Sequence, residues 1–356
     1  MRFAESPFRP FLFLVLAALL WLNGCSSRPP SGADPAGGRE REALVREREA
    51  LVREREAWVR ETLDRLTLEE KVGQMIMSKA YGYYYSTRSD EYRRLEHVVK
   101  EHKFGGLIMM QGEVYEAAAL INRMQALASV PLLVASDLEG GAAMRIRRST
   151  RFPEAMALAA TRDTSLAFRM GAALGREARA MGIFQVFAPV ADVNVNPANP
   201  VINVRSFGED PRLVAEMAGA VAAGLQSSGV LATAKHFPGH GDTDVDSHLD
   251  LPRIPASRAR LDSVELVPFR HLIDRGVSSV MIAHLEVPSV SGSGSLPSTL
   301  SGAVVRGKPA RWAYHDPRPC MLPPDWSGGY TSIFAIQQSE DWTKNRPKVA
   351  TGGGMM

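Results

Sequence analysis

The sequence is poor in cysteine, in net charge and in long apolar runs. Its 356 residues include two cysteines, Cys25 and Cys320. Cys25 is expected to be lipidated, as described below, so Cys320 has no partner for a disulfide. The formal net charge of +3 is too small to indicate binding to nucleic acid or to a charged membrane surface. The apolar run at residues 11–22 is shorter than the roughly 20 residues that a membrane-spanning helix needs. What remains is an ordinary globular composition, 45% apolar and 23% charged, in a chain long enough for one large domain or two smaller ones.

The amino terminus has the pattern of an export signal. Arg2 and Arg9 precede the apolar run, and a positive start followed by a short apolar core is typical of a secretion signal. Residues 22–25 (LNGC) resemble the lipobox of bacterial lipoproteins, with Cys25 as the acylated first residue of the mature chain; a plain signal peptide is the alternative. The resemblance implies an exported protein of the cell envelope that lipid on Cys25 anchors to a bacterial membrane.

Residues 26–60 are predicted to be a spacer. Residues 26–38 are rich in Pro, Gly and Ser and cannot form a core. Residues 39–59 repeat a unit of seven, REREALV, REREALV and REREAWV, which places a narrow apolar stripe on a strongly charged helix. A weak coiled coil is one interpretation; a solvated helical spacer, supported by Glu and Arg three and four residues apart, is the preferred one.

From residue 61 onward, apolar runs alternate with amphipathic stretches. The runs predicted as strands are residues 106–110, 131–136, 186–190, 230–234 and 279–283. The stretches predicted as helices are residues 113–128, 165–181, 212–227 and 261–275. Buried strands that alternate with helices indicate a parallel sheet, so the predicted fold class is α/β, with a (β/α)8 barrel of the TIM type first and an open doubly wound sheet second.

Polar residues stand just past these apolar runs. Asp137, Asp192 with Asn194, His236 and His284 each follow a predicted strand. In a barrel, the ends of the strands share one rim, and that rim carries the active site. The pattern therefore predicts a common cleft.

The most polar segment is residues 235–251 (KHFPGHGDTDVDSHLDL), in which proline and glycine exclude a helix through the first half. A solvated charged turn is one interpretation. A metal site of His236, His240, Asp242 and His248 is another, but His236 and His240 cannot line one helix face across that proline and glycine. The third is acid–base catalysis by a histidine that a carboxylate orients. Asp246 and His248, two residues apart, lie on one side of an extended loop, as such a pair requires.

This segment, KHFPGHGDT…DSH…LP, resembles the motif of the β-N-acetylglucosaminidase branch of glycoside hydrolase family 3. Residues 67–75 (TLEEKVGQM, with a capping box of Thr67 and Glu70), 136–145 (SDLEGGAAMR) and 205–211 (RSFGEDP) resemble further segments of that family. The resemblance covers residues 61–305. It implies an exo-acting, retaining hydrolase that releases β-linked N-acetylhexosamine from peptidoglycan or chitin fragments, with no metal and no organic cofactor.

The resemblance also implies roles for single residues. The expected sugar-binding residues are Asp137, Arg145, Arg205, Lys235, His236 and, with a less defined role, His284. Ala142 departs from the family, which often has arginine directly after the glycine pair. His248 is the expected acid–base residue, since an imidazole with a pKa near 6.5 exchanges a proton at neutral pH, and Asp246 would fix its tautomer.

Hydrolysis with retention of the anomeric configuration further requires a carboxylate nucleophile, and here the resemblance stops. Asp316 and Asp325 fall near the expected place, but neither follows an apolar strand, and Asp325, which precedes Trp326, is the first choice. Residues 306–356 are therefore expected to be out of register with the family, through a frameshift or a sequence error. The gene's other reading frames past codon 305 test this hypothesis.

A β-glucosidase or β-xylosidase and an inactive carbohydrate-binding remnant are the alternative functions; no oligomeric state is predicted.

Overall fold

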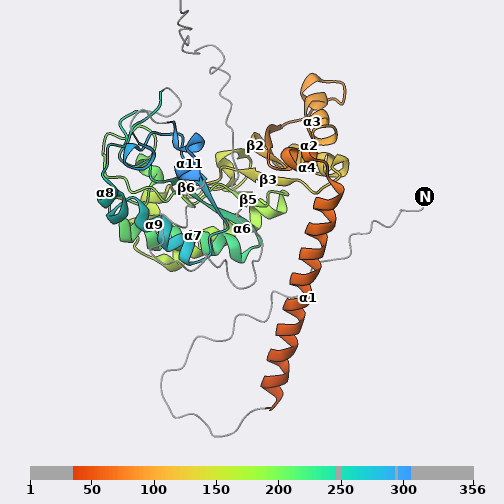
Figure 1. The fold of residues 1–356 in the computed structure, drawn as a ribbon, viewed down its shortest axis with the longest axis horizontal. Helices are drawn as coiled ribbons and strands as arrows, with labels where there is room; N and C mark the ends of the chain where they lie inside the picture. Colours follow the sequence, from red (N-terminus) through yellow and green to blue (C-terminus); the bar gives the residue numbers. More distant parts are fainter. Residues whose placement is uncertain (1–34, 246–249, 293–295, 306–356) are drawn as a thin grey trace, which may run out of the picture. The chain divides into compact units, whose positions relative to one another are not determined.

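The computed structural model describes residues 35–245, 250–292 and 296–305 (Figure 1). By its internal contacts the chain divides into two units, residues 1–54 and 55–356. Helix α1 (Pro35–Arg65) contains all three heptads, and the ion pairs Glu49–Arg53 and Glu56–Arg60 join its turns at 3.7 and 3.8 Å. Among the described helices, none combines the length and the apolar character of a membrane-spanning segment.

The second unit is built on a parallel sheet, which confirms the predicted α/β fold. Its strands pair in the order β1-β2-β3-β5-β6-β7, and the short β4 pairs with the end of β2. Their bounds are β1 Met77–Gly82, β2 Gly106–Glu113, β3 Leu133–Ser136, β4 Ile146–Arg147, β5 Gln185–Val186, β6 Leu231–Phe237 and β7 Ser279–Ile282. Within the described ranges β7 does not pair with β1, so these strands form an open, barrel-type sheet.

Helices connect the strands. The α-helices after α1 are α2 Leu68–Gln74, α3 Asp90–Lys100, α4 Val114–Leu127, α5 Ala155–Ala159, α6 Thr164–Ala180, α7 Pro211–Ser227, α8 Arg258–Ser263, α9 Leu266–Asp274, α10 Pro288–Ser291 and α11 Gly302–Val305. The 3-10 helices are η1 Ala142–Met144, η2 Asn203–Arg205 and η3 Ser298–Leu300. The predicted capping box is confirmed, because the Glu70 backbone N–H donates to Thr67 Oγ1 at 3.2 Å and the Thr67 N–H donates to Glu70 Oε2 at 3.0 Å.

The structure corrects three predicted elements. Strand β5 has two residues rather than five, and past its end single backbone hydrogen bonds from Thr233 and Lys235 to the carbonyls of Ala188 and Pro189 hold the chain beside β6. The predicted helix 261–275 is two helices, since the ring of Pro268 in the first turn of α9 clashes with a helical carbonyl at Val264. Strand β6 does not end at Ala234 but runs to Phe237, so the following two polar residues lie within it.

Helices α6, α7 and α9 lie side by side along the sheet (Figure 1). Glycines bring α6 and α7 into backbone contact: a Cβ at Gly224 would overlap the Phe168 carbonyl oxygen, and one at Gly171 would overlap the Val221 carbonyl oxygen. This close packing anchors strand β6, which contacts α7 and carries part of the site.

Gly224→Ala is expected to lower the free energy of unfolding by about 1–3 kcal/mol, because a backbone oxygen occupies the place of the new methyl group. Urea unfolding followed by circular dichroism measures the change. Gly140→Ala is the matched control, since the nearest atom to its Cβ would lie 3.7 Å away. Equal stability of the two variants would show that α6 and α7 are less closely packed than described.

Candidate active site

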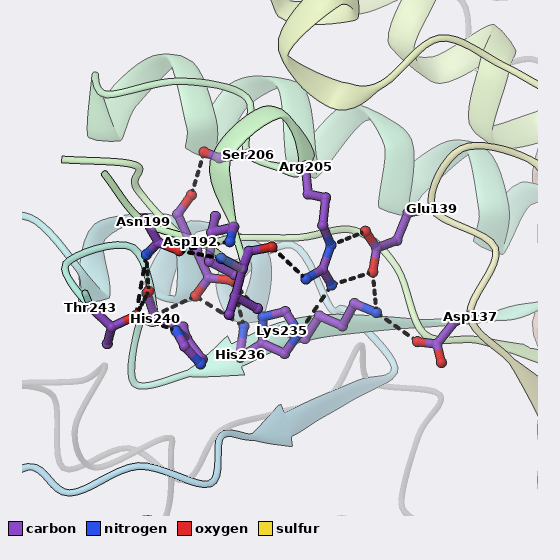
Figure 2. Close-up of polar contacts among 12 residues, drawn as sticks. Asp137, Glu139, Asp192, Asn199, Arg205, Ser206, Lys235, His236, His240 and Thr243 are labelled. Atoms are coloured by element: carbon purple, nitrogen blue, oxygen red, sulfur yellow. Dashed lines mark hydrogen bonds and ion pairs between the residues drawn. The ribbon is translucent and has the colours of Figure 1, made fainter. Parts of the chain in front are cut away.

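Lys235 stands at the centre of a buried charged cluster between strands β3 and β6 (Figure 2). The Lys235 side chain is 2% exposed, and its Nζ donates to Asp137 Oδ1 at 2.7 Å and pairs with Glu139 Oε1. Both acids follow β3, which lies two strands away across the two-residue β5. The peptide bond between Lys235 and His236 is cis. The parallel sheet thus joins residues that lie about a hundred positions apart in the sequence.

Two arginines complete the cluster. Arg205, from η2, holds Glu139 with two hydrogen bonds, Nε to Oε2 at 2.8 Å and Nη2 to Oε1 at 2.7 Å, a bidentate geometry that is strong and directional. Arg145 donates from Nη2 to Asp137 Oδ2 at 3.1 Å. Each carboxylate is therefore held by the lysine and by one arginine.

The cluster remains ionised at neutral pH. Burial by itself would raise the pKa of Glu139, but the charges of Lys235 and Arg205 outweigh it and hold that pKa well below its usual range. The pKa of Asp137 is lowered in the same way, by Lys235 and Arg145 against burial. Burial would lower the pKa of Lys235, and its two carboxylate partners raise it instead. The site thus presents fixed charged donors and acceptors rather than proton carriers.

These side chains form two layers. Lys235 and Glu139 are nearly inaccessible, with 2% and 9% of their side chains exposed. The side chains that a ligand can reach are those of Asp137, Arg145, Arg205 and His236. The inner pair therefore fixes the outer groups, which are partly exposed to solvent.

His236 is held by the fully buried Asp192. The carboxylate contacts the ring Nδ1 at 2.6 Å and accepts the backbone N–H of His240 at 2.7 Å. Burial would raise the pKa of Asp192, but the pKa is lowered by His236 and by these hydrogen bonds. Since an ionised carboxylate only accepts, Nδ1 carries the proton. The other ring nitrogen, Nε2, then lies 3.5 Å from Arg205 Nη2 on the reachable side of the cluster.

Asp192→Asn is expected to lower kcat/KM by about 10- to 100-fold while the fold is kept, because the amide no longer fixes a single imidazole tautomer. Nitrogen NMR shifts of the His236 ring report the tautomer directly, a readout that a merely structural role would leave unchanged. Ser206→Ala, which removes a hydrogen bond to the Asp192 backbone carbonyl, is a control for general loosening. An unchanged tautomer in Asp192→Asn would contradict the positioning role.

Three of the four candidate metal ligands, His236, His240 and Asp242, lie within the described residues. His240 contacts Thr243 Oγ1 through Nδ1 at 2.8 Å, and His236 uses its Nδ1 for Asp192. No group of three or more His, Cys, Asp or Glu in the described part of the chain is arranged to hold a metal ion. The fourth candidate ligand, His248, lies outside the described residues.

The other predicted residues divide into two groups. His284 is exposed after β7, where its Nδ1 contacts Thr299 Oγ1 at 2.8 Å; no contact with the charged cluster is described. Residues outside the described ranges are Asp246, His248, Asp316 and Asp325.

Glu139 was not among the residues predicted from the sequence, although it is a member of the cluster. Its spacing of two from Asp137, directly after a strand, was the available signal.

Comparisons with known proteins find chains that are similar to this one. Residues 67–308 match the family described as "Glycosyl hydrolase family 3 N terminal domain". The chain is 38% identical to "Beta-hexosaminidase A" of Pseudoalteromonas piscicida over 213 residues, 56% of this chain and 36% of that protein. It is 37% identical to "Beta-N-acetylglucosaminidase/beta-glucosidase" of Cellulomonas fimi over 230 residues, 65% of this chain and 40% of that protein.

A solved structure is similar as well. It is a glycoside hydrolase family 3 β-N-acetylglucosaminidase from Paenibacillus sp. str. FPU-7, with 43% sequence identity and a TM-score of 0.62. The similarity covers 68% of this chain and 46% of that one. The chain thus spans less than half the length of each of these three relatives.

Proposed function

Because the chain belongs to glycosyl hydrolase family 3, we propose that it hydrolyses glycosides and releases terminal β-linked N-acetylglucosamine, or a related N-acetylhexosamine, from oligosaccharides. The observation that carries the proposal is the two-layered charged cluster around Lys235 at the edge of the sheet. The names of the relatives, β-hexosaminidase and β-N-acetylglucosaminidase, support this choice of sugar.

The outer layer of the cluster suits a sugar ring. Asp137 accepts hydrogen bonds from hydroxyl groups, Arg145 and Arg205 donate to them, and His236 Nε2 accepts one. The ion pairs behind these groups fix them before the sugar arrives, so binding does not have to order them.

The chemical steps are assigned to residues outside the described ranges. His248, oriented by Asp246, gives a proton to the glycosidic oxygen, and that oxygen leaves with the rest of the oligosaccharide. A carboxylate, for which Asp325 is the first choice and Asp316 the second, bonds to the anomeric carbon as the old bond breaks. Water then displaces the carboxylate, its proton returns to the imidazole, and the sugar is released with retained configuration.

Assays of the purified chain on aryl β-N-acetylglucosaminide and aryl β-glucoside test the proposal. Cleavage of the first substrate with little or none of the second is the expected result. A β-glucosidase is the second candidate, because the Cellulomonas fimi relative is named for both activities. Cleavage of the glucoside alone would support that candidate, and cleavage of neither would favour a carbohydrate-binding protein.

We further propose how the hydrolase domain is connected to the rest of the protein and where in the cell it acts. Residues 1–25 act as a lipoprotein signal, residues 26–60 as a spacer, residues 61–305 as the hydrolase domain and residues 306–356 as a tail out of register with the family. Lipid on Cys25 would keep the protein at the cell envelope, where peptidoglycan or chitin fragments are substrates. Labelling with a radioactive fatty acid is expected to mark the wild type and not Cys25→Ser. Equal labelling of both would reject the anchor.

A further inference from the structure

We propose that a tyrosine surface next to the charged cluster binds the sugar units that follow the terminal one. We define this surface by Tyr83, Tyr84, Glu113, Tyr115 and Arg148. Tyr84 and Tyr115 are 84% and 81% exposed, and Tyr83 is 36% exposed. The proposal rests on the proposed function, since it assigns the remainder of the same oligosaccharide.

The backbone brings these side chains to one place. Gly82 at the end of β1 pairs with Gly112 near the end of β2, and a Cβ at Gly112 would lie 2.6 Å from the Gly82 carbonyl oxygen. A Cβ at Gly82 would lie 2.5 Å from Ala117 Cβ, in the first turns of α4. The two strand ends and the start of α4 are therefore pressed together, and Tyr83 and Tyr115 follow directly from them.

Charged groups lie among the tyrosines. Glu113, Tyr115 and Arg148 line one shallow hollow. Glu113 Oε1 accepts a hydrogen bond from Arg147 Nε at 2.6 Å, and Glu113 Oε2 lies 3.5 Å from Arg148 Nε. Glu113 Oε2 is buried and accepts no hydrogen bond from the described residues, so the exposed charge of this pair is that of the two arginines.

Strand β4 connects this surface to the charged cluster. Arg145 holds Asp137 with its side chain at 3.1 Å, and its carbonyl accepts the Gly112 N–H at 2.9 Å. Arg147, two positions later in β4, holds Glu113. The surface therefore begins next to the cluster that binds the terminal sugar.

The chemistry of the surface fits a neutral oligosaccharide. One face of a pyranose ring is lined by C–H groups and packs on the face of an aromatic ring, while the hydroxyl groups on its edge seek charged and polar partners. Exposed tyrosines interleaved with a carboxylate and guanidinium groups supply both. A second copy of the chain is the competing occupant of an exposed aromatic surface.

A comparison of two substrates tests the inference. The double variant Tyr83→Ala/Tyr115→Ala is expected to lower kcat/KM for the β-1,4-linked tetrasaccharide of N-acetylglucosamine by about 5- to 30-fold, given the modest worth of each aromatic contact. The same variant should cleave aryl β-N-acetylglucosaminide, which has one sugar unit, at the wild-type rate. Tyr83→Phe/Tyr115→Phe retains the rings and should restore most of the loss. Phe168→Ala, which removes a 40% exposed aromatic ring from α6, is the matched control.

Equilibrium binding separates failure of this inference from failure of the proposed function. If the wild type cleaves neither substrate, calorimetric titration with the tetrasaccharide still gives Kd for the wild type and for the variants. A weaker Kd in the double alanine variant alone supports the surface. Equal loss on both substrates, no loss on either, or no binding by the wild type would overturn it. So would a concentration-dependent dimer that the double variant abolishes, since the tyrosines would then bind a second copy.

Discussion

Replacement of Lys235 by methionine is expected to destabilise the protein by about 3–5 kcal/mol and to abolish sugar binding. The variant leaves Asp137 and Glu139 without their shared cation, and removal of one partner from a buried ion pair costs about that much. Methionine has a similar length, so loss of packing contributes little. Urea unfolding and calorimetric titration with N-acetylglucosamine measure the two effects. Lys100→Met, which breaks an exposed pair with Glu96, should change stability by less than about 1 kcal/mol.

The pH dependence of stability should change in the same variant. In the wild type the pKa of Glu139 is lowered on folding, so its stabilising contribution is complete above the unfolded value of about 4.3 and is lost as the pH falls below it. Without the Lys235 charge to oppose burial, the folded pKa of Glu139 moves up toward the unfolded value, so the stability lost by the variant as the pH falls should be smaller than in the wild type. Identical pH–stability curves for the wild type and Lys235→Met would show that the lysine does not stabilise the carboxylate.

Replacement of His248 by alanine is expected to lower kcat about 10²- to 10⁴-fold on aryl β-N-acetylglucosaminide while the unfolding midpoint is kept. The proposed reason is loss of the group that gives a proton to the leaving oxygen. His102→Ala, which removes an exposed histidine next to α3, is the control and should leave kcat unchanged.

The choice of leaving group sharpens this test. An aryl group that is a good leaving group needs little protonation, so His248→Ala should lose much less activity on a dinitrophenyl glycoside than on an alkyl glycoside. Equal losses on both would assign the proton transfer to another residue. Unchanged activity on both would remove His248 from the mechanism.

The parts of the fold that the sequence predicts are those with a clear hydrophobic period. Helices α6 and α7 match predicted stretches within one residue at each end, because their small and apolar residues recur on one face along seventeen positions. Strand β1 escaped prediction because its sequence, MSKAYG, contains no apolar run. Its place in the sheet is set by pairing with β2 rather than by its own hydrophobicity.

The candidate site was predictable in outline. Parallel strands end at one edge, so Asp137, Asp192 and His236 could be expected to lie together, and the structure places them around Lys235. The depth of each side chain could not be read from the sequence. Lys235 lies within β6 with 2% of its side chain exposed, and its pairing with two carboxylates is visible only in the structure.

The long separation between Asp137 and Lys235 has a consequence for how the protein is made. A nascent chain that has formed β1 to β3 already carries Asp137 and Glu139, but the residue that neutralises both emerges about a hundred residues later. Until then, the cations of the cluster that are already made are Arg145, which pairs with Asp137 alone, and later Arg205, which pairs with Glu139. The binding site of the finished molecule is therefore complete only after β6 has joined the sheet and brought Lys235 to both carboxylates.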